Sequence, residues 1–189
     1  MALNLLPVLR KSGKKTGVVP RLTIVTSEVH AWTPLDERKE DSIFDALNKN
    51  KPEYMKDRYP TSKLLEILFI RSLARELNNG PHADEKVILN AVNPGLCHSS
   101  LTRNSTGLAS LVMYVLKMLL ARKTEVGART LVAGAEAGEE SHGEYMSIGR
   151  VAQTAEFVRS EEGKKTQERV YTELIALLEK IQPGISKNI

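Results

Sequence analysis

The sequence predicts an α/β fold built on a mainly parallel sheet, and three features carry this prediction. Short β-branched or apolar runs lie at 21–27, 86–95 and 143–150, each bounded by Pro, Gly or polar residues as strands usually are. Longer runs with helical spacing separate them, which favours right-handed crossovers between parallel strands. The run 86–95 is apolar nearly throughout, as in a strand covered on both faces, so it belongs in the middle of the sheet.

The start of the chain has the features of a helix end. Arg10 and Lys11 stand where cations suit a helix C-terminus, and Gly13 follows as the expected end of the helix. After the first strand comes a long irregular stretch, 28–58, which contains many charges and two prolines. Loops of this length are usually functional or contain a short helix of their own, and 44–50 is the segment expected to form one.

The other helices are expected at 59–78, 105–121, 124–137 and 160–189. The first of these four has its leucines on one broad face, as in an amphipathic helix that packs on a sheet. Thr124 is the expected N-cap of the third. No internal repeat appears, so a single domain over 1–189 is the expected organisation.

Composition argues against several classes of function. The formal net charge is +4, but the basic residues cluster mainly near the two ends of the chain without aromatic residues among them, so no nucleic-acid partner is expected. The single Cys97 rules out an internal disulfide framework, and no secretory signal is visible, so a cytoplasmic location is expected. The most apolar run, 107–121, contains Lys117 and is too short to span a bilayer, although it could lie on a membrane surface.

A tyrosine and a lysine four residues apart, Tyr59 and Lys63, give the main chemical signal. At this spacing both side chains lie on one helix face, so the ammonium can favour the phenolate and help the tyrosine to transfer protons near neutral pH. The same spacing also occurs by chance on solvated helices. The pair therefore needs support from its surroundings.

That support comes from the ends of the predicted strands. Ser27 ends the first strand, and the loop from Asn93 to Thr102 follows the second. Because the carboxyl ends of parallel strands meet at one edge of a sheet, Ser27, the start of the Tyr59 helix and this loop should converge there. The four histidines show no metal-ligand spacing, so no metal site is predicted, and His98 alone is kept as a candidate acid/base helper.

Three segments carry a family resemblance: "RLTIVTSEVHAW", "DRYPTSKLLE" and "VILNAVNPGLCHSSLTR". In this order, and with Tyr-x-x-x-Lys followed by Asn-Pro-Gly, they resemble the short-chain dehydrogenase/reductase family over about residues 1 to 150. The likeness is greatest to retinol-dehydrogenase-like fungal reductases, which often accompany secondary metabolism. It implies a partial doubly wound, Rossmann-like parallel sheet.

The resemblance also implies roles for individual residues. Tyr59 would be the proton donor and acceptor, Lys63 would assist it and hold the nicotinamide ribose, and Ser27 would steady the substrate oxygen. The cofactor and substrate side of the site would be formed by Asn93, Pro94, Gly95, Leu96, Ser99 and Thr102. Residues 104–121 take the place of the family's substrate lid, where an apolar wall suits a small apolar carbonyl substrate.

The chain departs from the family at its start. It lacks the opening strand and the Thr-Gly-x-x-x-Gly-x-Gly turn that seats the dinucleotide pyrophosphate on a helix N-terminus. The resemblance therefore implies a truncated domain without the N-terminal dinucleotide-binding half, and NAD(P)H is expected only if that half is supplied. Strand 21–27 would lose a neighbour, so a homodimer or a complementing chain is expected to cover it.

Three functions stay open at this point. The first is an enzyme without nicotinamide that uses Ser27, Tyr59 and Lys63 for acid/base chemistry on a carbonyl substrate, in isomerisation, cyclisation or condensation. The second is an NAD(P)H-dependent carbonyl reductase whose other half is missing or supplied in trans. The third is a non-catalytic remnant that binds or scaffolds a partner.

Overall fold

The computed structural model describes residues 1–49, 57–98, 118 and 121–189, and it confirms the predicted α/β fold. The sheet of this described part has four strands in the order β1-β2-β3-β4. β1 (Arg21–Val25), β2 (Ile88–Asn93) and β3 (Tyr145–Ser147) are parallel, and β4 (Arg150–Val151) pairs antiparallel with β3. The result is a mostly parallel, partial Rossmann-like sheet.

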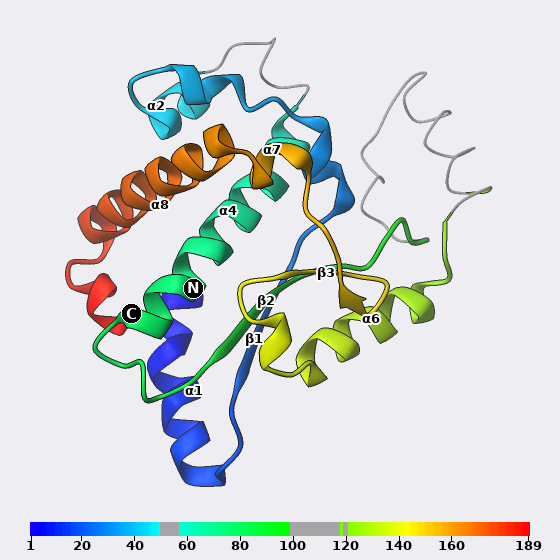
Figure 1. Ribbon diagram of the computed structural model, residues 1–189, viewed down its shortest axis with the longest axis vertical. Coiled ribbons are helices and arrows are strands. Elements are labelled where there is room, and N and C mark those ends of the chain that lie inside the picture. Colours follow the sequence, from blue (N-terminus) through cyan, green and yellow to red (C-terminus); the bar gives the residue numbers. More distant parts are fainter. Residues whose placement is uncertain (50–56, 99–117, 119–120) are drawn as a thin grey trace.

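Strand β2 lies between β1 and β3, and every one of its residues is buried, as predicted from its apolar sequence. Helices α4 (Arg58–Asn79) and α6 (Thr124–Glu136) lie to either side of the sheet (Figure 1). The buried Asn90 side chain donates to the Gly134 carbonyl of α6 at 2.9 Å. A Cβ on Gly134 would come within 2.4 Å of a Val92 methyl, so a glycine is needed for α6 to lie this close to the sheet.

Strand β1 is the outer strand on its side of the described sheet. Its backbone bonds to β2 start at the Pro20 carbonyl and end at the Thr26 N–H, at 2.9 and 2.8 Å. Since backbone groups alternate in direction along a strand, those of Arg21, Thr23 and Val25 face away from β2. The side of β1 that faces away from β2 therefore carries backbone groups that do not pair with β2, and β1 leads to the predicted site.

Helix α1 (Ala2–Thr16) is longer than predicted, so the expected end at Gly13 is wrong. The helix ends at Gly17, whose φ of 70° is the left-handed conformation that glycine adopts at helix C-termini. Gly13 instead lies inside the helix against Pro20, where a Cβ would come within 2.9 Å of the proline ring. Both glycines are therefore structural, but only the second is a cap.

The predicted single strand over 143–150 is a hairpin instead. β3 ends at Ser147, and Ile148 and Gly149, with φ values of 55° and 75°, turn the chain into β4. Two successive residues with positive φ are typical of a tight type I′ turn, which is rare outside glycine and asparagine. The short connection η4 (Glu139–Ser141) precedes the hairpin.

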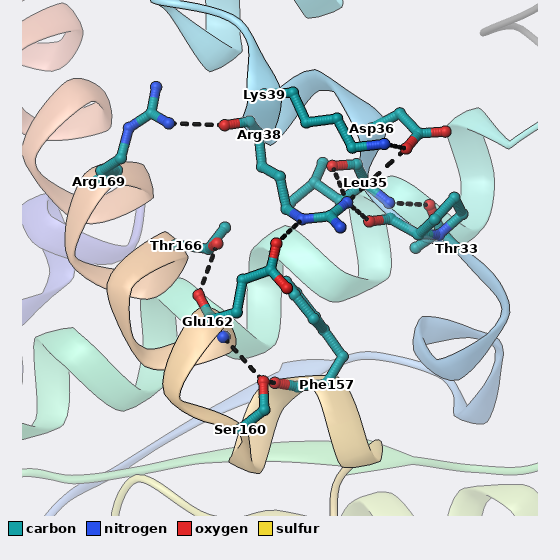
Figure 2. A network of polar contacts seen from close by, with 12 residues as sticks. Thr33, Leu35, Asp36, Arg38, Lys39, Phe157, Ser160, Glu162, Thr166 and Arg169 are labelled. Carbon is teal, nitrogen blue, oxygen red and sulfur yellow. Dashed lines mark hydrogen bonds and ion pairs between the residues drawn. The ribbon is translucent and has the colours of Figure 1, made fainter.

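The long stretch after β1 is ordered in its described part. It contains the short helices η1 (Glu28–Trp32), η2 (Asp36–Lys39) and α2 (Ile43–Asn48), the last of which confirms the helix expected at 44–50. Two arginines attach it to the helices α7 (Glu156–Arg159) and α8 (Glu161–Ile181). Arg38 donates to Glu162 at 2.8 Å and stacks over Phe157, while Arg169 donates to the Arg38 carbonyl at 2.6 Å (Figure 2).

Helix α8 confirms most of the helix predicted over 160–189, and η5 (Ile185–Asn188) follows it. It packs along α4, where Gln167 donates to the buried Ser72 hydroxyl at 3.1 Å and Tyr171 stacks on Phe69. This contact covers one face of α4 within the chain, and it does not test the homodimer expected to cover the first strand. The self-association therefore stays a prediction.

The helix and lid expected over 104–121 lie almost wholly outside the described residues. Among the helices that the structure describes, none is both long enough and apolar enough to cross a membrane.

Candidate active site

β1 ends at Val25, so the prediction that Ser27 ends this strand is wrong: Thr26 follows the strand, and Ser27 is the N-cap of η1. Its hydroxyl oxygen accepts a hydrogen bond from the Val29 N–H at 3.4 Å. A serine hydroxyl has one proton to donate and two lone pairs, and among the residues that the structure describes only one lone pair is used. This is compatible with the predicted contact to a substrate oxygen.

Tyr59 and Lys63 occupy the first turns of α4, as predicted. The Lys63 Nζ lies 5.8 Å from the centroid of the Tyr59 ring, so the two side chains do share one helix face. Tyr59 is 44% exposed. The two residues are therefore neighbours on one face of α4, and their acid/base role stays a prediction.

Lys63 pairs with Glu66, a residue that was not among the predicted site residues. Its Nζ lies 2.9 and 3.1 Å from the two carboxylate oxygens of Glu66 and donates to the Val25 carbonyl at 3.2 Å. An ammonium has three N–H donors, and the two oxygens of one carboxylate lie in nearly the same direction from Nζ, so Glu66 and the Val25 carbonyl need only two of them. A ligand could therefore bind the third donor of Lys63 without replacing either group.

Buried polar contacts hold the Ser27 turn against α4. The Thr26 hydroxyl donates to the Lys63 carbonyl at 3.2 Å, which ties the end of β1 to the turn that carries the lysine. One segment further on, the hydroxyls of Thr33 and Thr61 lie 3.0 Å apart in a buried contact. Ser27 is thus fixed relative to the start of the Tyr59 helix from two directions.

We expect Thr26→Val to lower the free energy of unfolding by about 1 kcal/mol, since it removes one buried intramolecular hydrogen bond but preserves the side chain's shape. Thr26→Ser keeps the hydroxyl and is the matched control. Urea-induced unfolding of the three proteins measures the effect. A larger loss in the serine variant than in the valine variant would show that Thr26 acts through its methyl group instead.

The Asn-Pro-Gly turn lies at the carboxyl end of β2, beside the end of β1. The Asn93 side chain accepts from the Gly95 N–H at 3.0 Å and donates to the Ser147 hydroxyl of β3 at 3.3 Å. Gly95 has a φ of 75°, so glycine is the residue suited to this position. Pro94 and Leu96 are half-buried within the same turn. The four residues are therefore at the predicted edge of the sheet.

The remaining predicted positions differ in outcome. Ser99 and Thr102 lie outside the described residues. His98 is exposed. Its carbonyl accepts a hydrogen bond from the Thr124 hydroxyl at 2.6 Å, so the Thr124 side chain bonds to this loop. The N-cap of α6 is Lys123 and not Thr124. The helper role of His98 stays a prediction, and the cap prediction is wrong.

Two buried side chains join the site without having been predicted. His30 and Tyr145 pack against each other with their ring centroids 5.0 Å apart, under the Ser27 turn and beside Asn93. Burial raises the pKa of Tyr145, while hydrogen bonding to Ser147 and Asn93 acts in the opposite direction. The Tyr145 phenol is therefore neutral near pH 7. In the sequence, the only hint of His30 is its place three residues after Ser27.

Fold and site together define an α/β protein with a candidate acid/base group at the carboxyl edge of its sheet. No protein-family model matches the chain. The chain is 40% identical to "Short-chain dehydrogenase anuD" of Penicillium roqueforti over 188 residues, which are 98% of this chain and 49% of that protein. It is 38% identical to "Short chain dehydrogenase/reductase dmxR8" of a Cryptosporiopsis species over an alignment of 192 residues, which covers 100% of this chain and 57% of that protein.

A third relative, "Short chain dehydrogenase FGM9" of Gibberella zeae, is 38% identical over 185 residues, which are 98% of this chain and 54% of that protein. The chain belongs to the short-chain dehydrogenase/reductase family. It spans about half the length of the curated relatives that it matches.

Proposed function

We propose that this chain catalyses proton transfer on a small apolar carbonyl compound, with Tyr59 as the acid/base group and without nicotinamide. The observation that carries the proposal is the placement of Lys63. Its ammonium lies on the Tyr59 face of α4, and its backbone carbonyl is bonded to Thr26, next to Ser27. An acid/base group, a positive charge and a hydroxyl donor are thus held on one edge of the sheet.

In the proposed reaction the Ser27 hydroxyl donates a hydrogen bond to the substrate carbonyl oxygen. Tyr59, as the phenolate, takes a proton from the carbon next to the carbonyl, so the C–H bond breaks and the electron pair forms an enolate. The Lys63 ammonium stabilises negative charge on the phenol oxygen before this step, and Ser27 stabilises it on the enolate oxygen afterwards. Return of the proton to a different carbon completes an isomerisation. In a cyclisation or an aldol-type condensation, the enolate carbon instead bonds to a second carbonyl carbon, whose C=O π bond breaks and whose oxygen takes the proton from Tyr59.

The residues present fit a nicotinamide dinucleotide only in part. Lys63 and the turn from Asn93 to Leu96 could line the nicotinamide end, where Lys63 already bonds Glu66 and the Val25 carbonyl. The 189 residues contain no Gly-x-x-x-Gly-x-Gly turn for the pyrophosphate. Contacts to one end of a dinucleotide give poor affinity, so no step of the proposed reaction uses it.

We expect the purified chain to exchange the α-protons of a ketone such as 2-tetralone for deuterium in heavy water, with a rate that saturates in ketone and does not change when NADPH is added. Proton NMR measures the exchange, and calorimetric titration with NADPH should show no saturable binding. Saturable NADPH binding together with ketone reduction would contradict the proposal. A folded protein that neither exchanges protons nor binds NADPH would instead favour a binding or scaffold role.

The second candidate is carbonyl reduction with NAD(P)H after a further polypeptide segment completes the sheet. Two observations favour it: the backbone groups of Arg21, Thr23 and Val25 face away from β2, and the relatives are about twice as long as the matched region. The calorimetric titration can be repeated after addition of the part of the Penicillium relative that lies outside the match. NADPH binding that appears only in the mixture would place this candidate first.

A further inference from the structure

His30 is the buried side chain most directly attached to the Ser27 turn. It is 3% exposed, and both of its ring nitrogens have backbone partners. The Nδ1 atom lies 2.8 Å from the Ser27 carbonyl oxygen, and the Nε2 atom lies 3.0 Å from the Ala155 nitrogen, at the N-cap of α7. The imidazole therefore bridges the end of β1 and a segment 125 positions away in the sequence.

The partners of His30 fix its protonation. A backbone N–H can only donate, so the Nε2 atom facing Ala155 must be the unprotonated acceptor. A carbonyl can only accept, so the Nδ1 atom facing Ser27 must carry the proton. Both contacts are satisfied only by the neutral ring with its proton on Nδ1.

We infer that His30 is a positioning residue for Ser27, holding the Ser27 carbonyl through its Nδ1–H so that the Ser27 hydroxyl keeps its direction toward the edge of the sheet. The Ser27 carbonyl also accepts from the His30 backbone N–H at 3.2 Å, so the side chain adds a second and shorter bond to the same oxygen. Tyr145 packs against the ring and limits its rotation. The contacts of the His30 ring described here are with Ser27, Ala155 and Tyr145, so His30 would act through Ser27 and not on the substrate directly. Its role rests on the proposed function of Ser27.

Acid should break the contact between His30 and Ala155, whereas the bond to the Ser27 carbonyl needs only the Nδ1 proton. Burial lowers the pKa of His30, and the Ser27 carbonyl and the Glu28 charge oppose the shift without cancelling it. The titratable groups facing the ring are Glu28 in its own turn and Tyr145 from β3, and α7 contributes the Ala155 N–H. A proton on Nε2 would point at that N–H, so the charged ring loses its bond to Ala155 and can no longer bridge the two segments.

Nitrogen NMR of the histidine side chains tests the geometry without any substrate. His142 is an internal control, because its Nδ1 accepts from the Leu89 N–H at 3.2 Å and its Nε2 faces the Ala74 carbonyl at 3.1 Å, which demands the opposite tautomer. We expect His30 with a protonated Nδ1 and His142 with a protonated Nε2 at pH 7. A neutral His30 with its proton on Nε2, or a His30 that is charged at pH 7, would overturn the inference.

Two substitutions separate the bond to Ser27 from the bond to Ala155. In the deuterium-exchange assay, His30→Asn can keep a donor near the Nδ1 position, whereas His30→Gln places its amide near the Nε2 position. We expect the glutamine variant to lose about tenfold in kcat, in line with a displaced catalytic group, and the asparagine variant to keep most of it. The Nδ1–H of a charged ring would still bond the Ser27 carbonyl, so protonation of His30 alone should lower the rate less than the glutamine substitution does.

The reverse order, with glutamine active and asparagine inactive, would show that His30 supports the α7 segment and does not position Ser27. If the wild-type chain shows no exchange at all, the proposed function fails, but the nitrogen NMR still decides whether His30 holds the Ser27 carbonyl. The two failures are therefore distinguishable.

Discussion

Replacing Tyr59 with phenylalanine should lower the rate of deuterium exchange by at least about a hundredfold, the usual scale for removal of a general acid or base. The substitution removes only the hydroxyl, and Tyr59 is 44% exposed, so the fold should be unaffected. The measurement is the initial rate of deuterium incorporation into the ketone at saturating concentration. Circular dichroism of the variant shows whether the helix that carries position 59 is intact.

Tyr171→Phe is the matched control for this experiment. Tyr171 lies on α8 against Phe69, and burial raises its pKa to about 12, so it remains neutral and should take no part in the reaction. The control should keep the wild-type rate. If Tyr59→Phe also keeps it, Tyr59 is not the acid/base group, and the proposed mechanism fails even if the chain is an enzyme.

Leu68→Ala should lower the free energy of unfolding by about 2 to 5 kcal/mol, the range observed when a large apolar side chain is removed from a packed core. Leu68 is 0% exposed and lies on α4, the helix that carries Tyr59 and Lys63. Its removal leaves a cavity that the surrounding core can close only in part. Urea-induced unfolding measures the change through the midpoint and the slope of the transition.

Ile181→Ala is the surface control for the core substitution, because Ile181 is 79% exposed at the end of α8. It should change the free energy of unfolding by less than about 0.5 kcal/mol. Equal effects in the two variants would contradict the described core. A large loss for Leu68→Ala with normal exchange below its unfolding transition would separate the stability of α4 from its chemistry.

Regular hydrophobic patterns were enough to predict the central elements. The continuous apolar run around β2 indicates a strand that is buried on both faces. The leucines of α4 recur at helical spacing, which indicates a helix that is buried on one face. The turn chemistry was harder to predict. Gly13 and Gly17 are equally suited to a helix end by composition, and only packing against Pro20 shows that the helix continues past the first.

The candidate site was predictable where its residues follow strand ends or helical spacing. Tyr59 and Lys63 lie on the expected helix, whereas Ser27 lies two residues beyond the last residue of its strand. His30 and Glu66 were missed for different reasons. The bond of His30 to Ala155 depends on the way the chain folds back on itself, and Glu66 resembles any acidic residue on an exposed helix face.

The contact between Lys63 and the Val25 carbonyl has a consequence for how the chain behaves in solution. Val25 is the last residue of β1, and its carbonyl faces away from β2, on the side where another strand could pair. A lysine ammonium bonded there blocks one acceptor and places a charge at the strand end, which is how many proteins discourage edge-to-edge aggregation. We therefore expect Lys63 to hinder strand pairing at this end of β1 in addition to its proposed chemical role, and a neutral substitution at this position should remove both effects together.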